Sequence, residues 1–275
     1  MINLIRAHLY RVLHDKTMWV VCICFFLYAI IAGIVFIEIN AYNLGHGGSY
    51  ILGSSLSTIS ALSFSAFPAI LCPFFIPAFI GREWKSGTFR NQTVSGFSRL
   101  QMFFGMFITL FAVTTIALLV CFGLLWVILL IGQTPFAAVA GTMSGKQYFL
   151  SFFLLLLELF MVDAVATFFS FVCRSSLGGL FATLGFFFIL GIVVSLTELF
   201  QSINRGSYYQ FLEFLPTYQL NHLTNLSLDL AADYLGEVIP GRELAFSLKT
   251  VLVTVVISAA SLVGGAFIFT KNDLR

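Results

Sequence analysis

Residues 101–131 read QMFFGMFITLFAVTTIALLVCFGLLWVILLI and contain no Asp, Glu, Lys or Arg. A helix rises about 1.5 Å per residue, so about 20 apolar residues suffice to cross the hydrocarbon core of a bilayer. This segment is longer than that minimum. It is therefore predicted to be a transmembrane helix.

Five further segments have the same apolar character, and with the first they predict an all-α polytopic membrane protein with six transmembrane helices. Hydrophobic residues make up 59% of the sequence and charged residues 9%, against roughly 25% charged in soluble domains. A water-facing surface cannot be built from this composition. Residues 1–275 are thus expected to form one transmembrane domain, with further spans near residues 17–38, 57–80, 147–172, 176–198 and 249–270.

Residues 2–16 precede the first span and have the periodicity of an amphipathic helix. We expect this helix to lie in the membrane interface, and its charged residues argue against a cleavable signal peptide. One predicted face is apolar and the other polar. The apolar face carries Ile2, Ile5, Leu9, Val12 and Leu13, and the polar face carries His8, Arg11, His14 and Asp15.

Basic residues near the spans predict the orientation, because Lys and Arg accumulate on the cytoplasmic side. With a cytoplasmic N-terminus, ten basic residues lie inside and four outside. Both termini are therefore predicted to be cytoplasmic, in a bacterial plasma (inner) membrane. The inner set is Arg6, Arg11, Lys16, Arg82, Lys85, Arg90, Arg99, Arg174, Lys271 and Arg275, and the outer set is Lys146, Arg205, Arg242 and Lys249.

The connections between the spans differ in length. The turn at residues 173–176 is minimal, whereas residues 81–100 form a polar cytoplasmic segment long enough for a short helix. The extracytoplasmic loop, residues 199–248, has an apolar part at 208–220 that is expected to dip into the membrane as a re-entrant hairpin. The absence of an internal repeat weakens transporter folds built from duplicated halves.

Residues 81–90 read GREWKSGTFR and residues 95–99 read SGFSR. They resemble the Glu-x-x-x-Gly-Thr segment, followed by a small residue-x-Ser-Arg element, of type-2 ABC exporter permeases. The N-terminal helix, the six spans, Leu215-Pro216-Thr217 and the closing residues 270–274, TKNDL, are similar to that family as well. The resemblance is to its peptide and lantibiotic export and immunity branch.

The resemblance implies that the helix around Glu83 docks into a groove on an ATPase and transmits its movement to the spans. An alternative is a positive-inside anchor in which Glu83 pairs with Lys85 or Arg82 at the membrane interface. Gly87 is suited to end a short helix, because glycine readily adopts the left-handed conformation of that position. The residues assigned to ATPase coupling are Arg82, Glu83, Trp84, Lys85, Gly87, Thr88 and Arg90.

The same resemblance implies partners: two cytoplasmic ABC ATPase subunits and a second permease, identical or closely related. The expected cargo is an amphipathic or hydrophobic peptide, with small drugs or ions as weaker candidates. The nearest match to a P-loop, residues 141–147, is one residue short and has Gln147 in place of the magnesium-binding hydroxyl. We therefore expect no ATP site and no enzymatic activity in this chain, with ATP and Mg²⁺ on the partner.

Glu158 and Asp163 lie within the fourth predicted span, where an unpaired carboxylate costs at least roughly 2.5 kcal/mol. Both are expected to face the protein interior. Five residues separate them, which places them roughly 140° apart on a helix and argues against one two-carboxylate site. Their role is either functional, in substrate passage or proton movement, or structural, as hydrogen-bond partners of neighbouring spans. The former use defines an alternative function, a proton-coupled carrier or channel.

Two groups of residues are candidates for mechanical or assembly roles. Three prolines in the second span, Pro68, Pro73 and Pro77, are expected to bend it, as a moving hinge or as a static kink. Small residues at four-residue spacing allow close helix approach, either at a dimer seam or within one subunit. These residues are Ala29 and Gly33 in the first span, and Gly178 and Ala182 in the fifth.

No metal site is predicted, because His46 and His222 are isolated and the cysteines lie in or beside apolar runs.

Overall fold

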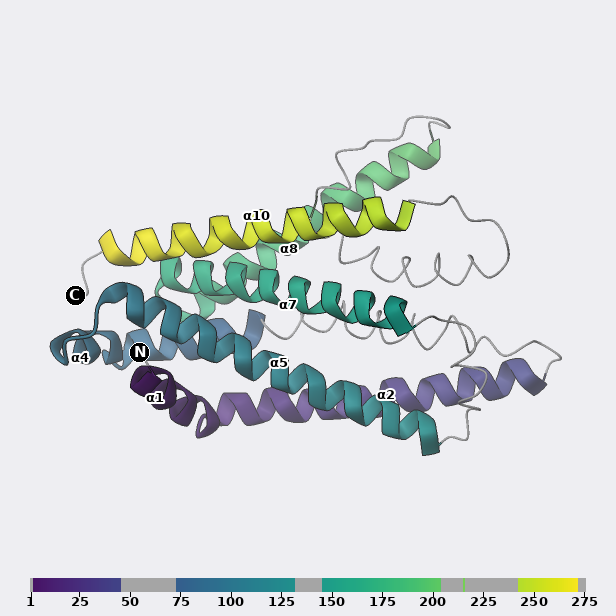
Figure 1. Ribbon diagram of the computed structural model, residues 1–275, viewed down its shortest axis with the longest axis horizontal. Coiled ribbons are helices and arrows are strands. Elements are labelled where there is room, and N and C mark those ends of the chain that lie inside the picture. The colour runs from purple at the N-terminus through teal and green to yellow at the C-terminus, as the bar shows by residue number, and fades with distance from the viewer. Residues whose placement is uncertain (1, 46–72, 132–144, 204–214, 216–241, 272–275) are drawn as a thin grey trace.

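The computed structural model describes residues 2–45, 73–131, 145–203, 215 and 242–271 (Figure 1). These residues form helices and short turns, with no strand among them. The long helices lie side by side along the long axis of the molecule (Figure 1). The helices are α1 (Ile2–Leu13), α2 (Lys16–Gly45), a helix over residues 73–85, α4 (Thr88–Val94), α5 (Arg99–Ile131), α7 (Gly145–Cys173), α8 (Ser176–Ile203) and α10 (Arg242–Lys271).

Five described helices are long and apolar enough to cross a membrane. This confirms an all-α fold with helices of membrane-spanning character. The second predicted span, residues 57–80, lies mostly outside the described residues, and its last part belongs to the helix over residues 73–85. The five stretches are Lys16–Val35, Arg99–Cys121, Phe152–Cys173, Ser176–Thr197 and Leu248–Lys271.

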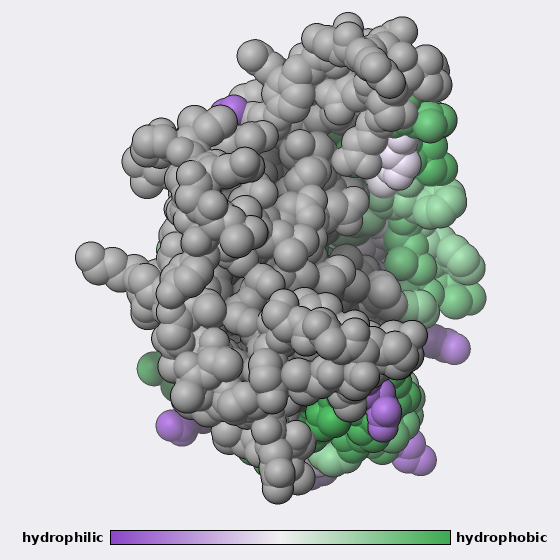
Figure 2. Space-filling model, turned by 90° about the vertical axis from the view of Figure 1, so that its right-hand side faces the viewer, coloured by the Kyte–Doolittle hydropathy of each residue, from purple (hydrophilic) through white to green (hydrophobic). Residues whose placement is uncertain are grey.

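The exposed surface of the long helices is rich in large apolar side chains. Phe181 and Phe188 on α8 are 69% and 70% exposed, and Val263 on α10 is 68% exposed. On the face drawn in Figure 2, the described side chains include broad hydrophobic patches. Such surfaces are unfavourable in water and favourable in lipid, so they support a membrane-embedded protein.

α7 is the central helix of the described bundle. It packs against α10, α8 and α5, and α5 in turn packs against α2 and α1. The membrane-spanning window of α7 is 61% buried and that of α5 is 50% buried, whereas the window of α2 is only 18% buried. The described core therefore lies around α5 and α7, and α2 is a peripheral helix.

The predicted short turn between the fourth and fifth spans is confirmed. α7 ends at Cys173 and α8 begins at Ser176. Arg174 between them has a φ of 52°, a left-handed conformation that residues other than glycine rarely adopt. The Ser175 hydroxyl accepts a hydrogen bond from the Gly178 amide at 2.9 Å and so caps the start of α8.

α1 is a helix as predicted, but the face that it buries differs from the expected one. Leu4, His8 and Val12 are buried, whereas Ile2 is 69% exposed. α1 packs on α5, and a Cβ atom at Gly105 would lie 3.2 Å from Leu4 Cδ2, a tight contact. The absence of a side chain at this glycine allows the close approach. Hydrophobic periodicity did not identify the buried face of α1. Packing against α5 buries a row of residues spaced by four, which is not the more apolar side of the helix.

Candidate functional site

The segment predicted to couple the chain to a partner lies at one end of the bundle. α1, α4, the start of α5 and the end of α10 gather there, on the left of Figure 1, close to both marked termini. This is the predicted cytoplasmic end of the molecule, and we call it the inner end. The site is built from the helix over residues 73–85, from α4 and from the helices that touch them.

Two ion pairs join the inner end of the helix over residues 73–85 to the N-terminal region. Arg11 of α1 pairs with Glu83, and Arg82 pairs with Asp15 at 2.5 Å. The Arg82 guanidinium also donates to the Thr17 hydroxyl at 2.6 Å. The ion pair that the structure shows for Glu83 is with Arg11 of α1, and the anchoring alternative, with its pairing to Lys85 or Arg82, stays a prediction.

Glu83 faces the interior of the chain. Its side chain is only 10% exposed, and burial raises the pKa of its carboxyl above the ordinary 4.5, although the Arg11 guanidinium opposes that rise. His8, one turn before Arg11, is fully buried. Burial, helped by the Arg11 charge, lowers the pKa of His8 to about 4, so its ring is neutral at physiological pH.

Trp84 belongs to an aromatic cluster at the inner end that the sequence did not predict. Its ring centroid lies 5.0 Å from that of Phe89 on α4, and the Arg174 guanidinium lies 5.4 Å from its ring centroid. The other rings come from α5, α7 and α10, with neighbouring centroids 4.8 to 6.5 Å apart. The aromatic cluster consists of Trp84, Phe89, Phe103, Phe171 and Phe269.

The aromatic cluster ties five elements together. Phe89, Phe103, Phe171 and Phe269 are among the largest fully buried side chains of the described chain. Aromatic pairs at these separations contribute about 0.5–1.5 kcal/mol each beyond the area they bury. Through Phe89, α4 is in ring contact with the helix over residues 73–85, with α7 and with α10. Among the 33 phenylalanines of the sequence, no local signal marks the ones that meet here.

Gly87 ends the helix over residues 73–85, as predicted. Its φ is 68°, a left-handed conformation that glycine adopts without cost, and α4 starts at the next residue. The Ser86 and Thr88 hydroxyls lie 2.7 Å apart on either side of it. The chain thus reverses sharply enough for α4 to fold back over the aromatic cluster.

α4 buries one face and exposes the other. Phe89 and Gln92 point inward, whereas Val94 is 84% exposed and Arg90 and Asn91 are exposed as well. Among the predicted coupling residues, Arg82, Lys85 and Arg90 are exposed, Trp84, Gly87 and Thr88 are half-buried, and Glu83 is buried. The exposed side of α4 is its outer face, which we define by Arg90, Asn91 and Val94.

The helix over residues 73–85 also packs closely against the α7–α8 turn. A Cβ atom at Gly81 would lie 2.2 Å from the Ser176 backbone nitrogen, and one at Gly179 would lie 3.1 Å from Pro77. The helix therefore sits between the N-terminal region and the start of α8. Pro73 and Pro77 are buried in this continuous helix, whereas Pro68 lies outside the described residues.

The two intramembrane carboxylates of α7 are both buried. The Thr114 hydroxyl of α5 donates a hydrogen bond to Asp163 Oδ2 at 2.5 Å. Structural hydrogen bonding was one of the two roles that the sequence allowed for these carboxylates. Glu158 is 1% exposed, and neither of its carboxylate oxygens has a hydrogen-bond partner among the described residues.

The small residues proposed for a dimer seam make contacts within the chain. Ala29 is 2% exposed, and a side chain at Gly33 would collide with Ile128 of α5 at 2.7 Å. Gly178 lies against Ser175 and Cys173 of its own turn, and Ala182 is half-buried. The contact of Gly33 with α5 fits the packing alternative, and the seam stays a prediction.

No group of three or more His, Cys, Asp or Glu side chains placed to hold a metal occurs among the residues that the structure describes. The extracytoplasmic loop, with its predicted re-entrant hairpin, lies almost wholly outside them. No known protein family model matches the sequence, and no curated protein is significantly similar to it.

Proposed function

We propose that this chain is the membrane-spanning subunit of an ATP-driven ABC exporter that moves amphipathic or hydrophobic peptides outward. ATP and Mg²⁺ would bind to a separate ATPase, present in two copies on the cytoplasmic side. A second permease subunit, identical or closely related, would complete the translocation path. Both termini are cytoplasmic in this proposal, and the membrane is a bacterial plasma membrane.

One observation carries the proposal: α4 is exposed on one face and bonded to the bundle through the other. Val94 is 84% exposed although it is apolar, and Arg90 and Asn91 flank it. This exposed face lies at the predicted cytoplasmic end of the bundle, where a soluble partner could reach it. α4 lies between the helix over residues 73–85 and α5, which starts at Arg99, so a docked partner would act on both.

The buried face of α4 supports a mechanical role. Phe89 contacts Trp84, Phe171 and Phe269, whose ring centroids lie 5.0 to 5.5 Å away. Packed interiors resist deformation, so a push on α4 would be carried into α7, α10 and the helix over residues 73–85. In this arrangement the ion pairs of Glu83 and Arg82 bring α1 and the start of α2 into the same moving unit.

Co-expression with a P-loop ATPase encoded beside this chain tests the proposal. The chain is expected to co-purify with that ATPase and to raise its ATP hydrolysis when an amphipathic peptide is added. Arg90→Glu should lower both association and stimulation. Arg6→Glu is the matched control, because Arg6 is also exposed but lies on α1. If both variants lose association and stimulation equally, or if both retain them, docking on α4 is contradicted.

A second candidate function is a proton-coupled carrier, which the complete burial of Glu158 and Asp163 favours. A transport assay in liposomes distinguishes the exporter from the carrier. The exporter is expected to accumulate a fluorescent amphipathic peptide only with the ATPase and ATP present. Accumulation by this chain alone under a pH gradient, lost in Glu158→Gln, would support the carrier and contradict the exporter.

A further inference from the structure

Glu158 of α7 is a buried carboxyl without a polar contact. The residue is 1% exposed, and neither carboxylate oxygen has a hydrogen-bond partner among the described residues. Asp163, five residues later on the same helix, differs because it accepts a hydrogen bond from Thr114 of α5. An ionised carboxylate without a partner is costly inside a membrane protein, whereas a neutral carboxyl is tolerated. The protonated form of Glu158 therefore fits the described arrangement.

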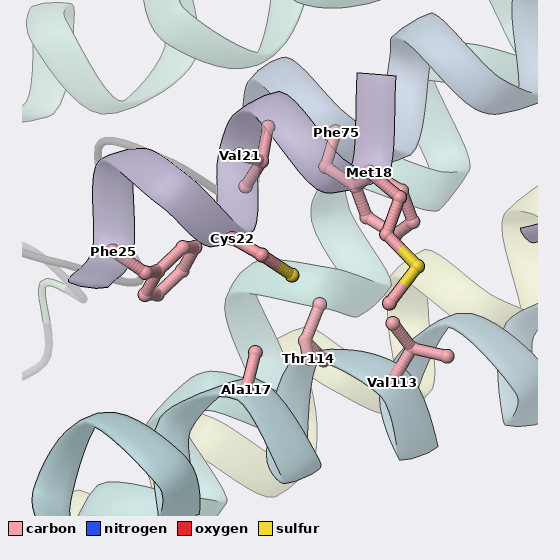
Figure 3. A pocket seen from close by; sticks show the side chains of 8 residues that line it. All are labelled: Met18, Val21, Cys22, Phe25, Phe75, Val113, Thr114 and Ala117. Carbon is pink, nitrogen blue, oxygen red and sulfur yellow. The ribbon is translucent and has the colours of Figure 1, made fainter. Parts of the chain in front are cut away.

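The cavity drawn in Figure 3 does not serve Glu158. It lies between α2 and α5, encloses about 10 Å³, and is lined by the labelled residues, which do not include Glu158. Thr114 lines it from α5, and the hydroxyl of the same residue bonds to Asp163. Glu158 is turned roughly 140° from Asp163 around α7, so the two carboxyls project in different directions.

α7 and α10 lie side by side and run in the same direction (Figure 1). A Cβ atom at Gly264 of α10 would lie 3.3 Å from the Phe168 ring of α7. Farther along both helices, the ring centroids of Phe171 and Phe269 lie 4.9 Å apart. Positions that precede these contacts by the same number of residues therefore lie at the same level of the bundle.

Thr254 of α10 lies at the level of Glu158. Each of the two is ten residues, or about 15 Å, before the contact of the Phe168 ring with α10. Thr254 is 1% exposed, and its hydroxyl also has no hydrogen-bond partner among the described residues. Thr250 and Ser258, one turn to either side, are buried as well. These three residues form a row of hydroxyls on the buried face of α10, which we call the hydroxyl row.

The hydroxyl row extends from the level of Glu158 to the end of the bundle opposite the inner end, which we call the outer end. The membrane-spanning stretch of α10 starts at Leu248, two residues before Thr250. In α7 the corresponding stretch starts at Phe152, six residues or about 9 Å before Glu158, and ends fifteen residues after it, at Cys173. The shorter route from Glu158 to water therefore leads to the outer end.

A proton is the ligand that these surroundings fit. A metal cation needs several oxygen ligands, whereas the Glu158 oxygens have no polar contact among the described residues. The helices around α7 bring few charges near it. Residues 100–131 of α5 and 176–197 of α8 contain no Asp, Glu, Lys, Arg or His, and the span of α10 has only Lys249 at its outer end and Lys271 at its inner end.

We propose that Glu158 is a proton-binding site reached from the outer end along the hydroxyl row of α10. Its carboxyl carries the proton in the described arrangement and transfers it to a water molecule that enters beside the row, leaving a carboxylate and a hydronium ion. Hydroxyls suit such a route because each donates and accepts hydrogen bonds. The inference does not rest on the proposed function, since it holds whether ATP or a proton gradient drives transport.

Infrared spectroscopy of the full chain in phosphatidylcholine vesicles tests the site at neutral pH. The spectrum of Glu158→Gln is subtracted from that of the native chain, so that the contribution of Asp163 cancels. The difference is expected to contain the carbonyl band of one protonated carboxyl and no carboxylate bands. Carboxylate bands in place of the carbonyl band would overturn the proposal.

Deuterium exchange tests the route. In heavy water the same carbonyl band moves to lower frequency as the Glu158 proton is replaced. Thr254→Val keeps the shape of the side chain but removes a hydroxyl of the row, and it should slow the exchange about fivefold, as the loss of one hydrogen-bonding group predicts. Thr183→Val is the matched control, because the buried Thr183 hydroxyl lies on α8 and donates to the Gly179 carbonyl. Exchange at the native rate in Thr254→Val, or equal slowing in both variants, contradicts a route along α10.

Discussion

Arg11 and Glu83 lie 72 positions apart in the sequence and form an ion pair that joins α1 to the helix over residues 73–85. A second pair, Arg82 with Asp15, runs alongside with the opposite polarity. The N-terminal region contributes one basic and one acidic side chain, and the helix over residues 73–85 contributes their two oppositely charged partners. This alternation specifies how the two segments align, because a shifted pairing would place like charges together.

The first prediction concerns this pair. Glu83→Ala and Arg11→Ala should each lower the free energy of unfolding by roughly 1–3 kcal/mol, because each leaves a partly buried charge without its partner. The reversed pair, Arg11→Glu with Glu83→Arg, should recover part of that loss. Thermal unfolding of the purified chain in detergent measures the effect.

Lys85→Ala serves as the control for this series, since Lys85 is exposed on the same segment and should change stability little. A double-mutant cycle then isolates the interaction between Arg11 and Glu83. Strict additivity of the two single losses would show that the ion pair contributes nothing beyond the separate side chains.

The second prediction concerns acid sensitivity. The pKa of His8 is about 4 in the folded chain and 6.5 in its ordinary state, so between these values the unfolded chain binds more protons. Stability from this group is complete above pH 6.5 and falls as the pH drops toward 4, by on the order of 2 kcal/mol at pH 5. His8→Leu should remove this component.

The measurement is the difference in melting temperature between pH 7 and pH 5, compared for the native chain and His8→Leu. The raised pKa of Glu83 acts in the opposite direction, because its folded form binds a proton more readily as the pH falls. Comparing the two proteins cancels that contribution. An identical acid shift in both would rule out His8 as the cause.

Local patterns in the sequence predicted the features that depend on neighbouring residues. Apolar length identified the five described spans, Gly87 identified the end of a helix, and the few residues at 173–176 identified a tight turn. Each of these follows from hydrophobicity or backbone freedom over a few positions.

Features that depend on distant segments were not predictable in this way. The inward orientation of His8 and Asp15 depends on α5 and on Arg82, and the aromatic cluster depends on five helices that meet at one level. With 33 phenylalanines in the sequence, no local signal distinguishes the few that meet from those that face lipid.

The third prediction concerns the bond across the centre of the bundle. Thr114→Val keeps the shape of the side chain but removes the hydroxyl that donates to Asp163, so it should cost roughly 1–3 kcal/mol in stability. Thr109→Val is the matched control, because the buried Thr109 hydroxyl donates only to the Gly105 carbonyl of its own helix in the described structure. If both variants melt at the same temperature, the contact with Asp163 is not stabilising.

The fourth prediction separates the two faces of α4. Val94→Asp should abolish association with the ATPase without changing the melting temperature, because Val94 is 84% exposed. Phe89→Leu should leave association intact, because Phe89 is buried beneath the proposed docking surface and touches Trp84, Phe171 and Phe269. It should instead reduce peptide transport per ATP hydrolysed, since a smaller aliphatic side chain transmits the movement of α4 less rigidly.

The comparison stays informative even if Phe89→Leu lowers stability, because large-to-small core changes cost roughly 1–3 kcal/mol and that loss is measured independently. Phe103→Leu, in the same aromatic cluster but on α5, serves as the reference for a change of equal size away from α4. A mechanical role for Phe89 requires that its variant lose more transport per ATP than the Phe103 variant at matched stability. Equal losses would mean that the aromatic cluster only holds the helices together, and that movement of α4 reaches the spans by another route.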